Sequence, residues 1–277
     1  MSCRPPAVVA LTAALWCAGV LVHPADRAGA TAHPAGAQQA GRPRADAPHP
    51  GHAGDAITPT ARKLNELFGG NSAAAEKGFE SEDRAIFRKR FEVLDALQLR
   101  PGMHVADVGA GSGFFTRLMA ERVGPRGTAY GVEVSGLLVA HIERTARAHG
   151  LTNVKAVLGS PASPNLPPAS VDLVLVADAY HHFEYPREML RGIKDALRPD
   201  GVLWLIDFDR IPGVSHPFIL QDVRADRATF VREFADAGFE LAGEARIFTD
   251  EYVLKFRHRG APAAPAGARP SGPAGKR

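Results

Sequence analysis

The sequence predicts an α/β fold built on a doubly wound, mostly parallel β-sheet that ends in an antiparallel hairpin strand. Short apolar runs alternate with helical patterns between residues 105 and 206. A glycine-rich turn follows the first run, and two further strand patterns stand close together near residue 250. Such alternation is typical of parallel sheets with right-handed crossovers, and the 45% apolar content is enough to fill their core.

The apolar runs are short and rich in Val, Ile and Leu, as in strands buried on both faces. Strands are expected at Val105–Val108, Thr128–Val134, Val154–Leu158, Val171–Ala177 and Val202–Ile206. Helices, with apolar residues at 3.6-residue spacing, are expected at Phe114–Val123, Gly136–Ala148 and Pro186–Leu197. A turn at Arg198–Gly201 should end the last of these helices.

The flanks of this core carry further elements. An amphipathic helix is expected at Arg227–Ala237, followed by strands at Phe239–Ile247 and Tyr252–Arg257 that would form the final hairpin. Towards the N-terminus, Ser72–Leu99 has helical spacing and should pack on the sheet or cover a binding site.

The folded unit is expected to span residues 59–259. Residues 31–58 and 260–277 are rich in Ala, Gly and Pro and contain few large apolar side chains. Such segments bury too little apolar surface to offset their ordering entropy, so we expect a disordered linker and a disordered tail.

Residues 1–30 have the pattern of a secretory signal peptide. Arg4 precedes the uncharged run Ala7–Val22, and Ala28–Ala30 provides a small-residue cleavage site. We therefore expect export to the periplasm or the medium, with no transmembrane span in the mature chain. Cys3 and Cys17 would be removed with the signal. One alternative is an uncleaved membrane anchor. The other is a misplaced start codon, in which case the protein would be cytoplasmic.

The charge pattern argues against nucleic-acid binding. The chain has 33 Lys and Arg residues against 30 Asp and Glu residues, and no basic run is interleaved with aromatic residues. The His residues of the linker are irregularly spaced and the mature chain would lack Cys, so no metal site is predicted.

The strongest local signal is the glycine-rich turn after the first strand. Asp107 ends that strand, and Gly109, Gly111 and Gly113 follow in the pattern G-x-G-x-G. Glycine lets the backbone adopt unusual dihedral angles and approach a ligand closely. A dinucleotide-binding turn needs G-x-G-x-x-G, and Phe114 occupies its last position, which disfavours a nicotinamide-dependent oxidoreductase.

Glu133 stands at the end of the second strand, where a carboxylate can accept hydrogen bonds from both hydroxyls of a ribose. Asp107 is placed to hold a cationic amino-acid group. This position of Asp107 also favours adenosylmethionine over a pyrophosphate, which the carboxylate would repel.

From Val105 to Asp207 the chain resembles class I S-adenosylmethionine-dependent methyltransferases across their motif series. The resemblance includes the third-strand segment Asn153–Gly159, the fourth-strand segment Val171–Asp178 and the Leu197–Leu203 turn. Together with Arg84 and the stretch Asp178–His182, the chain is similar to a bacterial family known only as predicted methyltransferases.

The resemblance implies a Rossmann-like fold with S-adenosylmethionine as cofactor. The implied cofactor-binding residues are Asp107, Gly109, Gly111, Gly113, Glu133, Ser160 and Asp178. Ser160 departs from the pattern, because many relatives carry at its position an Asp that contacts the adenine amino group. A serine hydroxyl can still accept a hydrogen bond there.

The candidate catalytic residues are His181 and His182, which follow the fourth strand at the edge where such sheets bind ligands. A base is needed only if the acceptor must lose a proton, and the ordinary pKa of histidine suits that task. His182 is preferred, because Tyr180 and Phe183 flank the pair with apolar surface, and Tyr180 would line the acceptor pocket. Both histidines could instead be structural.

We expect the acceptor to be a small molecule, although the fold also methylates lipids and proteins at oxygen, nitrogen, carbon or sulfur. An exported protein that binds adenosylmethionine or a nucleoside without turnover is the alternative, since the cofactor is made in the cytosol. The sequence does not indicate an oligomeric state.

Overall fold

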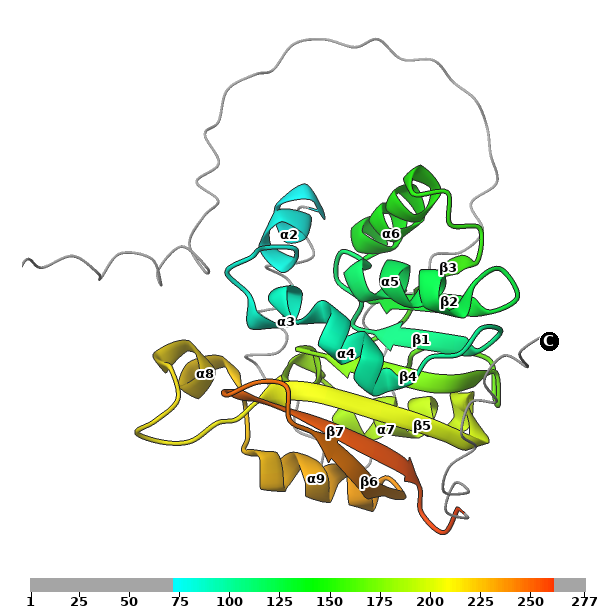
Figure 1. Ribbon diagram of the computed structural model, residues 1–277. Coiled ribbons are helices and arrows are strands. Elements are labelled where there is room, and N and C mark those ends of the chain that lie inside the picture. The colour runs from blue at the N-terminus through cyan, green and yellow to red at the C-terminus, as the bar shows by residue number, and fades with distance from the viewer. Residues whose placement is uncertain (1–71, 262–277) are drawn as a thin grey trace, which may run out of the picture. The chain divides into compact units, whose positions relative to one another are not determined.

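The structure is a computed structural model that describes residues 72–261 (Figure 1). The predicted signal peptide, the linker, the first residues of the predicted domain and the tail beyond residue 261 lie outside the described residues.

A seven-stranded sheet in the order β3-β2-β1-β4-β5-β7-β6 forms the centre of the fold (Figure 1). Only β7 runs antiparallel to its neighbours, because β5 and β6 both pair with it in antiparallel register. The predicted α/β class with a final hairpin is therefore confirmed. The strands are β1 (His104–Val108), β2 (Thr128–Glu133), β3 (Val154–Leu158), β4 (Val171–Ala177), β5 (Leu197–Phe208), β6 (Phe239–Ala245) and β7 (Glu251–His258).

Helices cover both faces of the sheet (Figure 1). On one face, apolar side chains of α3 (Ala85–Arg88), α4 (Arg90–Leu97) and α5 (Phe114–Val123) pack against β1, β4 and β5. On the other face, α7 (Pro186–Ala196) and α9 (Arg227–Asp236) bury theirs. With helices on both sides, β4 is almost wholly buried, which explains its continuous apolar run. The helix α6 (Gly136–Ala148) lies along β2 and β3.

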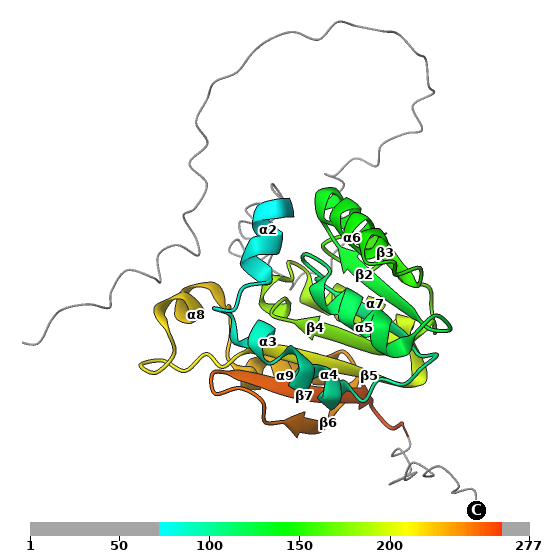
Figure 2. The same cartoon turned by 45° about the horizontal axis from the view of Figure 1, so that its top comes forward.

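The predicted helical stretch 72–99 is divided into α2 (Ser72–Phe79), α3 and α4. The break after Phe79 coincides with a turn in which Ser81 Oγ accepts the backbone N–H of Asp83. This short-range bond competes with helix continuation. Both views place α2, α3 and α8 (Pro217–Asp222) at one end of the sheet, beside the carboxyl ends of the parallel strands (Figure 1 and Figure 2).

Two other elements differ from expectation. The predicted turn Arg198–Gly201 is part of β5, which pairs with β4 at Val171↔Leu197 and again from Leu173↔Val202. The extra residues of β5 form a bulge, so the strand continues through a segment whose residues favour a turn. The helix α8 was not predicted, because its six residues are too short to show helical periodicity.

Candidate active site

The glycine-rich turn joins β1 to α5 in a backbone conformation that favours glycine. Gly109, Gly111 and Gly113 have φ angles of +79°, +56° and +76°. A Cβ at Gly109 would lie 2.6 Å from the Ala179 side chain, and one at Gly111 would lie 3.0 Å from the Phe79 ring. The glycines are therefore required both by backbone conformation and by the close approach of neighbouring segments.

Glu133, at the end of β2, ties this strand to the glycine turn. Its Oε1 accepts the Gly111 N–H at 2.7 Å, and its Oε2 accepts the Val134 N–H at 2.9 Å. Burial raises the pKa of Glu133, and these backbone donors partly offset that effect. Each carboxylate oxygen can accept a second hydrogen bond, so the side chain retains capacity for ligand hydroxyls.

Asp107 lies buried one strand away, and its Oδ2 accepts the Thr116 hydroxyl at 2.8 Å. Burial, with a smaller contribution from the charge of Glu133, raises the pKa of Asp107 to about 7. Neither carboxyl forms an ion pair with any residue between 72 and 261. A ligand that brings a positive charge and hydroxyl donors matches this environment, and S-adenosylmethionine has both.

Ser160 follows β3 at the same edge of the sheet. The preceding residue, Gly159, donates its N–H to the backbone carbonyl of Glu133 at 2.9 Å, which places the loop after β3 beside the end of β2. The Ser160 N–H donates to the Ser163 carbonyl at 2.8 Å, and its hydroxyl oxygen accepts the Ala162 N–H at 3.3 Å. The structure thus brings Ser160, Glu133 and the glycine turn together.

Asp178, predicted with the cofactor residues, lies instead in a second polar group. It has a φ angle of +49°, unusual for a non-glycine residue, and its Oδ2 accepts Arg84 Nη2 at 2.6 Å. Burial raises the pKa of Asp178, whereas the charge of Arg84 lowers it. Asp207 and His181 are its other charged neighbours, so Asp178 is grouped with the histidine pair.

His181, one of the two candidate bases, contacts Asp207 through both its ring and its backbone. Its Nδ1 lies 2.8 Å from Asp207 Oδ1, and its backbone N–H donates to Asp207 Oδ2 at 3.2 Å. Burial disfavours the imidazolium, but the contact with Asp207 and the charges of Asp178 and Asp222 together outweigh it and raise the pKa of His181. The His182 ring lies 4.2 Å from the His181 ring between centroids. Burial first, and then the charges of His181 and Arg84, hold the pKa of His182 well below its usual range.

The expectation that Tyr180 lines the acceptor pocket is wrong. Its side chain is fully buried among Phe183, Phe230 and Phe234, and its hydroxyl donates to Glu233 Oε2 at 2.6 Å. Tyr180–His182 form a 3₁₀ turn, in which side chains three residues apart project to the same side. Tyr180 and Phe183 therefore both face the core.

The segment from Phe79 to Arg84 crosses between the two groups. Glu80 Oε1 accepts Arg117 Nη2 at 2.7 Å and the Ser112 hydroxyl at 2.8 Å, so it is anchored at the glycine turn. At its other end, Arg84 reaches Asp178. The role of Arg84 and Glu80 was not predicted, because their partners are distant in sequence. Asp207 was also missed, although its place after the fifth apolar run parallels that of Asp178 after the fourth.

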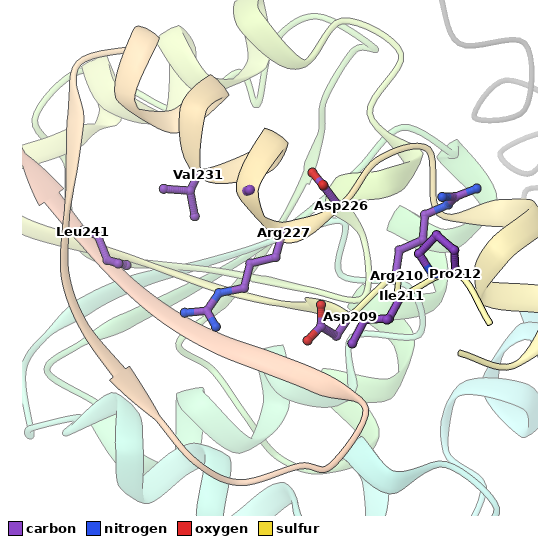
Figure 3. Close-up of a pocket in the computed structure, with 9 residues that line it drawn as sticks. Asp209, Arg210, Ile211, Pro212, Asp226, Arg227, Val231 and Leu241 are labelled. Carbon is purple, nitrogen blue, oxygen red and sulfur yellow. The ribbon is translucent and has the colours of Figure 1, made fainter. Parts of the chain in front are cut away.

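A separate surface hollow of about 530 Å³ contains none of the predicted site residues. Figure 3 shows its lining from the segment after β5, from the start of α9 and from Leu241 of β6. Between residues 72 and 261, no three His, Cys, Asp or Glu side chains are arranged to hold a metal ion. In the same part of the chain, no helix is long and apolar enough to span a membrane.

The chain is similar to known methyltransferases both in sequence and in fold. Residues 99–237, half of the chain, match the family described as "Methyltransferase domain". Nocamycin O-methyltransferase of Saccharothrix syringae is 34% identical over 113 residues, 41% of this chain and 40% of that protein. Protein-L-isoaspartate O-methyltransferase of Ignicoccus hospitalis is 32% identical over 102 residues, 37% of this chain and 47% of that protein. The matched region thus spans less than half the length of these two relatives.

Among solved structures, a SAM-dependent methyltransferase from Aquifex aeolicus superposes with a TM-score of 0.60 at 23% identity. The match covers 67% of this chain and 97% of that protein, and at this identity it shows a shared fold. The family match shows that the chain belongs to the methyltransferase-domain family, and the sheet order and the superposition show that it has the fold of class I S-adenosylmethionine-dependent methyltransferases.

Proposed function

We propose that this methyltransferase methylates a hydroxyl oxygen of a small molecule and that His181 is the general base. The observation that carries the proposal is the buried His181–Asp207 pair, with 2.8 Å between Nδ1 and Oδ1. The pair lies where β4 and β5 end, and ligands of open parallel sheets bind at the carboxyl ends of the strands.

Asp207 would hold His181 in the tautomer that carries its proton on Nδ1, leaving Nε2 as the acceptor for the hydroxyl proton. When that proton is taken up, the Asp207 carboxylate stabilises the imidazolium. S-adenosylmethionine, when bound, supplies an activated methyl group. The protein's own contribution is therefore to align the hydroxyl and to accept its proton, which together lower the barrier.

Geometry favours His181 over His182, which was preferred from the sequence. Burial and the charges of His181 and Arg84 hold the pKa of His182 well below its usual range, so His182 is the weaker base of the two. A base with a paired carboxylate has both a defined orientation and a higher proton affinity, as hydrolytic triads illustrate.

For the cofactor, we propose that Glu133 accepts the ribose hydroxyls, that Asp107 balances the positive charge and that Ser160 lies next to the adenine. Gly109, Gly111 and Gly113 would let the backbone approach the ligand. The support is the pair of buried carboxyls beside the positive-φ turn.

A hydroxyl acceptor fits better than a carboxylate. Both relatives described above are named O-methyltransferases, and one acts on L-isoaspartate in proteins, as its name states. A carboxylate is already deprotonated near neutral pH and needs no base. A buried His–Asp pair is suited to an acceptor group that must lose a proton.

Assay of the purified full chain with S-adenosylmethionine tests the proposal, with formation of S-adenosylhomocysteine as the readout. We expect turnover with phenols or alcohols and none with an L-isoaspartyl peptide. Turnover with the peptide alone would overturn the acceptor assignment. Tight cofactor binding without product for any acceptor would favour the alternative of a binding protein without turnover.

We also propose that the chain is exported and processed near Thr31. The support is the signal pattern of residues 1–30. Intact-mass measurement after expression in a Gram-negative host should find a mature chain in the periplasm or medium that lacks about thirty residues. Full-length protein in the cytosolic fraction would refute this.

A further inference from the structure

A third acidic side chain completes the polar group around His181. Glu251 is the first residue of β7, and because β7 is antiparallel to β5 it pairs with Phe208 at the carboxyl end of β5. Asp207 is the residue before Phe208, and Asp178 follows β4 at the same edge. We call Asp178, Asp207 and Glu251 the acidic cluster.

The acidic cluster contains three carboxyls but only two paired cations. Arg84 pairs with Asp178 at 2.6 Å, and His181 pairs with Asp207 at 2.8 Å. Glu251 forms no ion pair with any residue in the range 72–261. Burial and then the charges of Asp178 and Asp250 raise the pKa of Glu251 to about 10, with Asp207 adding to this and Arg84 opposing it. At neutral pH, Glu251 is therefore a neutral carboxylic acid that can donate a hydrogen bond.

Two polar atoms of the acidic cluster lack a hydrogen-bond partner in the described part of the chain. They are Asp178 Oδ1 and Glu251 Oε2, and they do not bond to each other. The Asp178 side chain is 5% exposed and Glu251 is 9% exposed, so both atoms are buried. Most buried polar atoms in native proteins are satisfied, which means that an exception calls for a ligand or another explanation.

The two atoms have opposite hydrogen-bonding character. Asp178 accepts from Arg84 through Oδ2, which leaves Oδ1 to accept a second hydrogen bond, whereas the protonated Glu251 can donate. One hydroxyl group satisfies both, because it donates one hydrogen bond and accepts another. An ether or a carbonyl oxygen lacks the donor, and an ammonium group lacks the acceptor.

We propose that Asp178 and Glu251 recognise a second hydroxyl of the methyl acceptor, one that is not methylated, by accepting its proton in a hydrogen bond at Asp178 Oδ1 and donating to its oxygen from Glu251. The acceptor is then a compound with at least two hydroxyl groups, one at His181 and one at this pair. The inference rests on the proposed hydroxyl methylation and narrows its substrate class.

Calorimetry on the full chain saturated with S-adenosylhomocysteine tests this without requiring turnover. The probes are phenol, the three dihydroxybenzene isomers and the three methoxyphenols. We expect at least one dihydroxybenzene to bind about tenfold more tightly than phenol, as one added charge-assisted hydrogen bond predicts. The matching methoxyphenol should show no such gain, because it cannot donate to Asp178.

Two variants at Glu251 separate a hydrogen-bond donor from a negative charge. In Glu251→Gln the amide N–H₂ still donates, so the preference for the dihydroxybenzene should stay within about threefold of wild type. In Glu251→Leu the preference should disappear while phenol affinity is unchanged. Unchanged affinity for S-adenosylhomocysteine shows that each variant is folded, and Glu121→Gln on the exposed side of α5 is the matched control. If the Leu variant does not fold, the Gln variant and the wild-type probe series decide.

Three results would overturn the inference. The first is equal binding of phenol and all dihydroxybenzenes, and the second is loss of the preference in Glu251→Gln as large as in Glu251→Leu. The third is a preference that is abolished by a chelator and restored by Mg²⁺, which would assign the two carboxyls to a cation. If the proposed methylation itself is wrong, turnover will be absent or independent of His181. The binding ratios are measured without turnover, so the two failures can be distinguished.

Discussion

The two polar regions at the edge of the sheet are built in different ways. The region at β1 and β2 uses residues that are close in sequence, because Asp107, the three glycines and Glu133 lie within one strand–helix–strand unit. The region at β4, β5 and β7 combines Arg84, Asp178, His181, Asp207 and Glu251, with Arg84 and Asp178 separated by 94 residues. In the described part of the chain, the two buried acids of the first region have no cationic partner, whereas two of the three acids of the second region pair with an arginine and a histidine.

The difference indicates a division of tasks. A cationic cofactor can balance the charge of the unpaired acids of the first region. That region therefore needs no cationic side chain of its own. The hydroxyl of a neutral acceptor must instead be oriented and lose its proton. This requires a base whose ring is held in place, and neighbouring polar groups whose hydrogen bonds are satisfied. Substitutions in the first region should therefore change cofactor affinity, whereas substitutions in the second should change turnover or acceptor binding.

The largest expected effect is at the base. His181→Ala should lower kcat by about 10²–10⁴ and leave cofactor affinity nearly unchanged, because general-base catalysis contributes that much. His182→Ala should lose less than about tenfold, since it affects only positioning. Steady-state kinetics with a hydroxyl acceptor and calorimetry with S-adenosylhomocysteine measure both. A larger loss of kcat in His182→Ala than in His181→Ala would instead support His182 as the base, as expected from the sequence.

The pH dependence of the same reaction sharpens this assignment. The neutral form of His181 is the base, so the rate should rise with pH through the pKa of His181. That pKa lies above the usual histidine value, since Asp207, Asp178 and Asp222 outweigh burial. In Asp207→Asn the step should move to lower pH. A step at the same pH in both proteins would exclude His181 as the titrating group.

The next effect concerns the glycine turn. Gly111→Val should weaken cofactor binding about a hundredfold or more, because a β-branched residue at φ +56° is strained and its side chain meets Phe79. Gly78→Ala is the control, since a Cβ there meets nothing within 4 Å. Calorimetry measures both, and nearly equal affinities would show that the turn does not touch the cofactor.

A smaller effect is expected at Glu133. Glu133→Ala should raise the Kd for S-adenosylmethionine about tenfold or more, because charge-assisted hydrogen bonds contribute about 1.5–3 kcal/mol each before water compensates. Glu121→Ala, on an exposed position of α5, should leave the Kd unchanged. Wild-type affinity in the Glu133 variant would remove the ribose assignment.

The smallest effect is the pH dependence of cofactor binding. Burial places the pKa of Asp107 at about 7, above its ordinary value, so the side chain takes up a proton as the pH falls below 7. The protonated acid no longer attracts a cation, and affinity should fall by up to about tenfold per pH unit below that point. Asp107→Asn should bind S-adenosylmethionine weakly. Its affinity should stay constant between about pH 5.5 and about pH 8, which is roughly the range in which Asp107 titrates. A steep profile in that variant would assign the titration elsewhere.

The turn and Glu133 were predictable because their signals are local. A buried strand, three glycines at fixed spacing and an acid at the end of the next strand occupy fewer than forty residues, on the scale of one strand–helix–strand unit. The strand and helix boundaries of this part agree closely with expectation, since β3, β4, α5 and α6 match residue for residue. Periodicity and turn chemistry act over the same short distances as the elements that they specify.

The prediction that Tyr180 lines the acceptor pocket was wrong because it rested on neighbours in sequence alone. Apolar neighbours in sequence suggested a shared pocket, but the 3₁₀ turn sends Tyr180 and Phe183 into the core and leaves His181 facing Asp207. Which side of a short turn meets the core depends on the helices that pack there, here α9 with Phe230 and Phe234. No local pattern contains that information.

The sequence by itself determined the fold class, the strand that carries Asp107 and the turn that follows it, because backbone conformation and apolar periodicity are properties of neighbouring residues. Only the tertiary structure decided that Asp207 contacts His181, that Arg84 pairs with Asp178 and that Glu251 joins them without a cationic partner among residues 72–261. Glu251 reaches this group because β7 runs antiparallel beside β5 and so begins at the carboxyl edge of the parallel strands. Burial then sets their charges, since the cost of an unpaired ion depends on the solvent that folding removes.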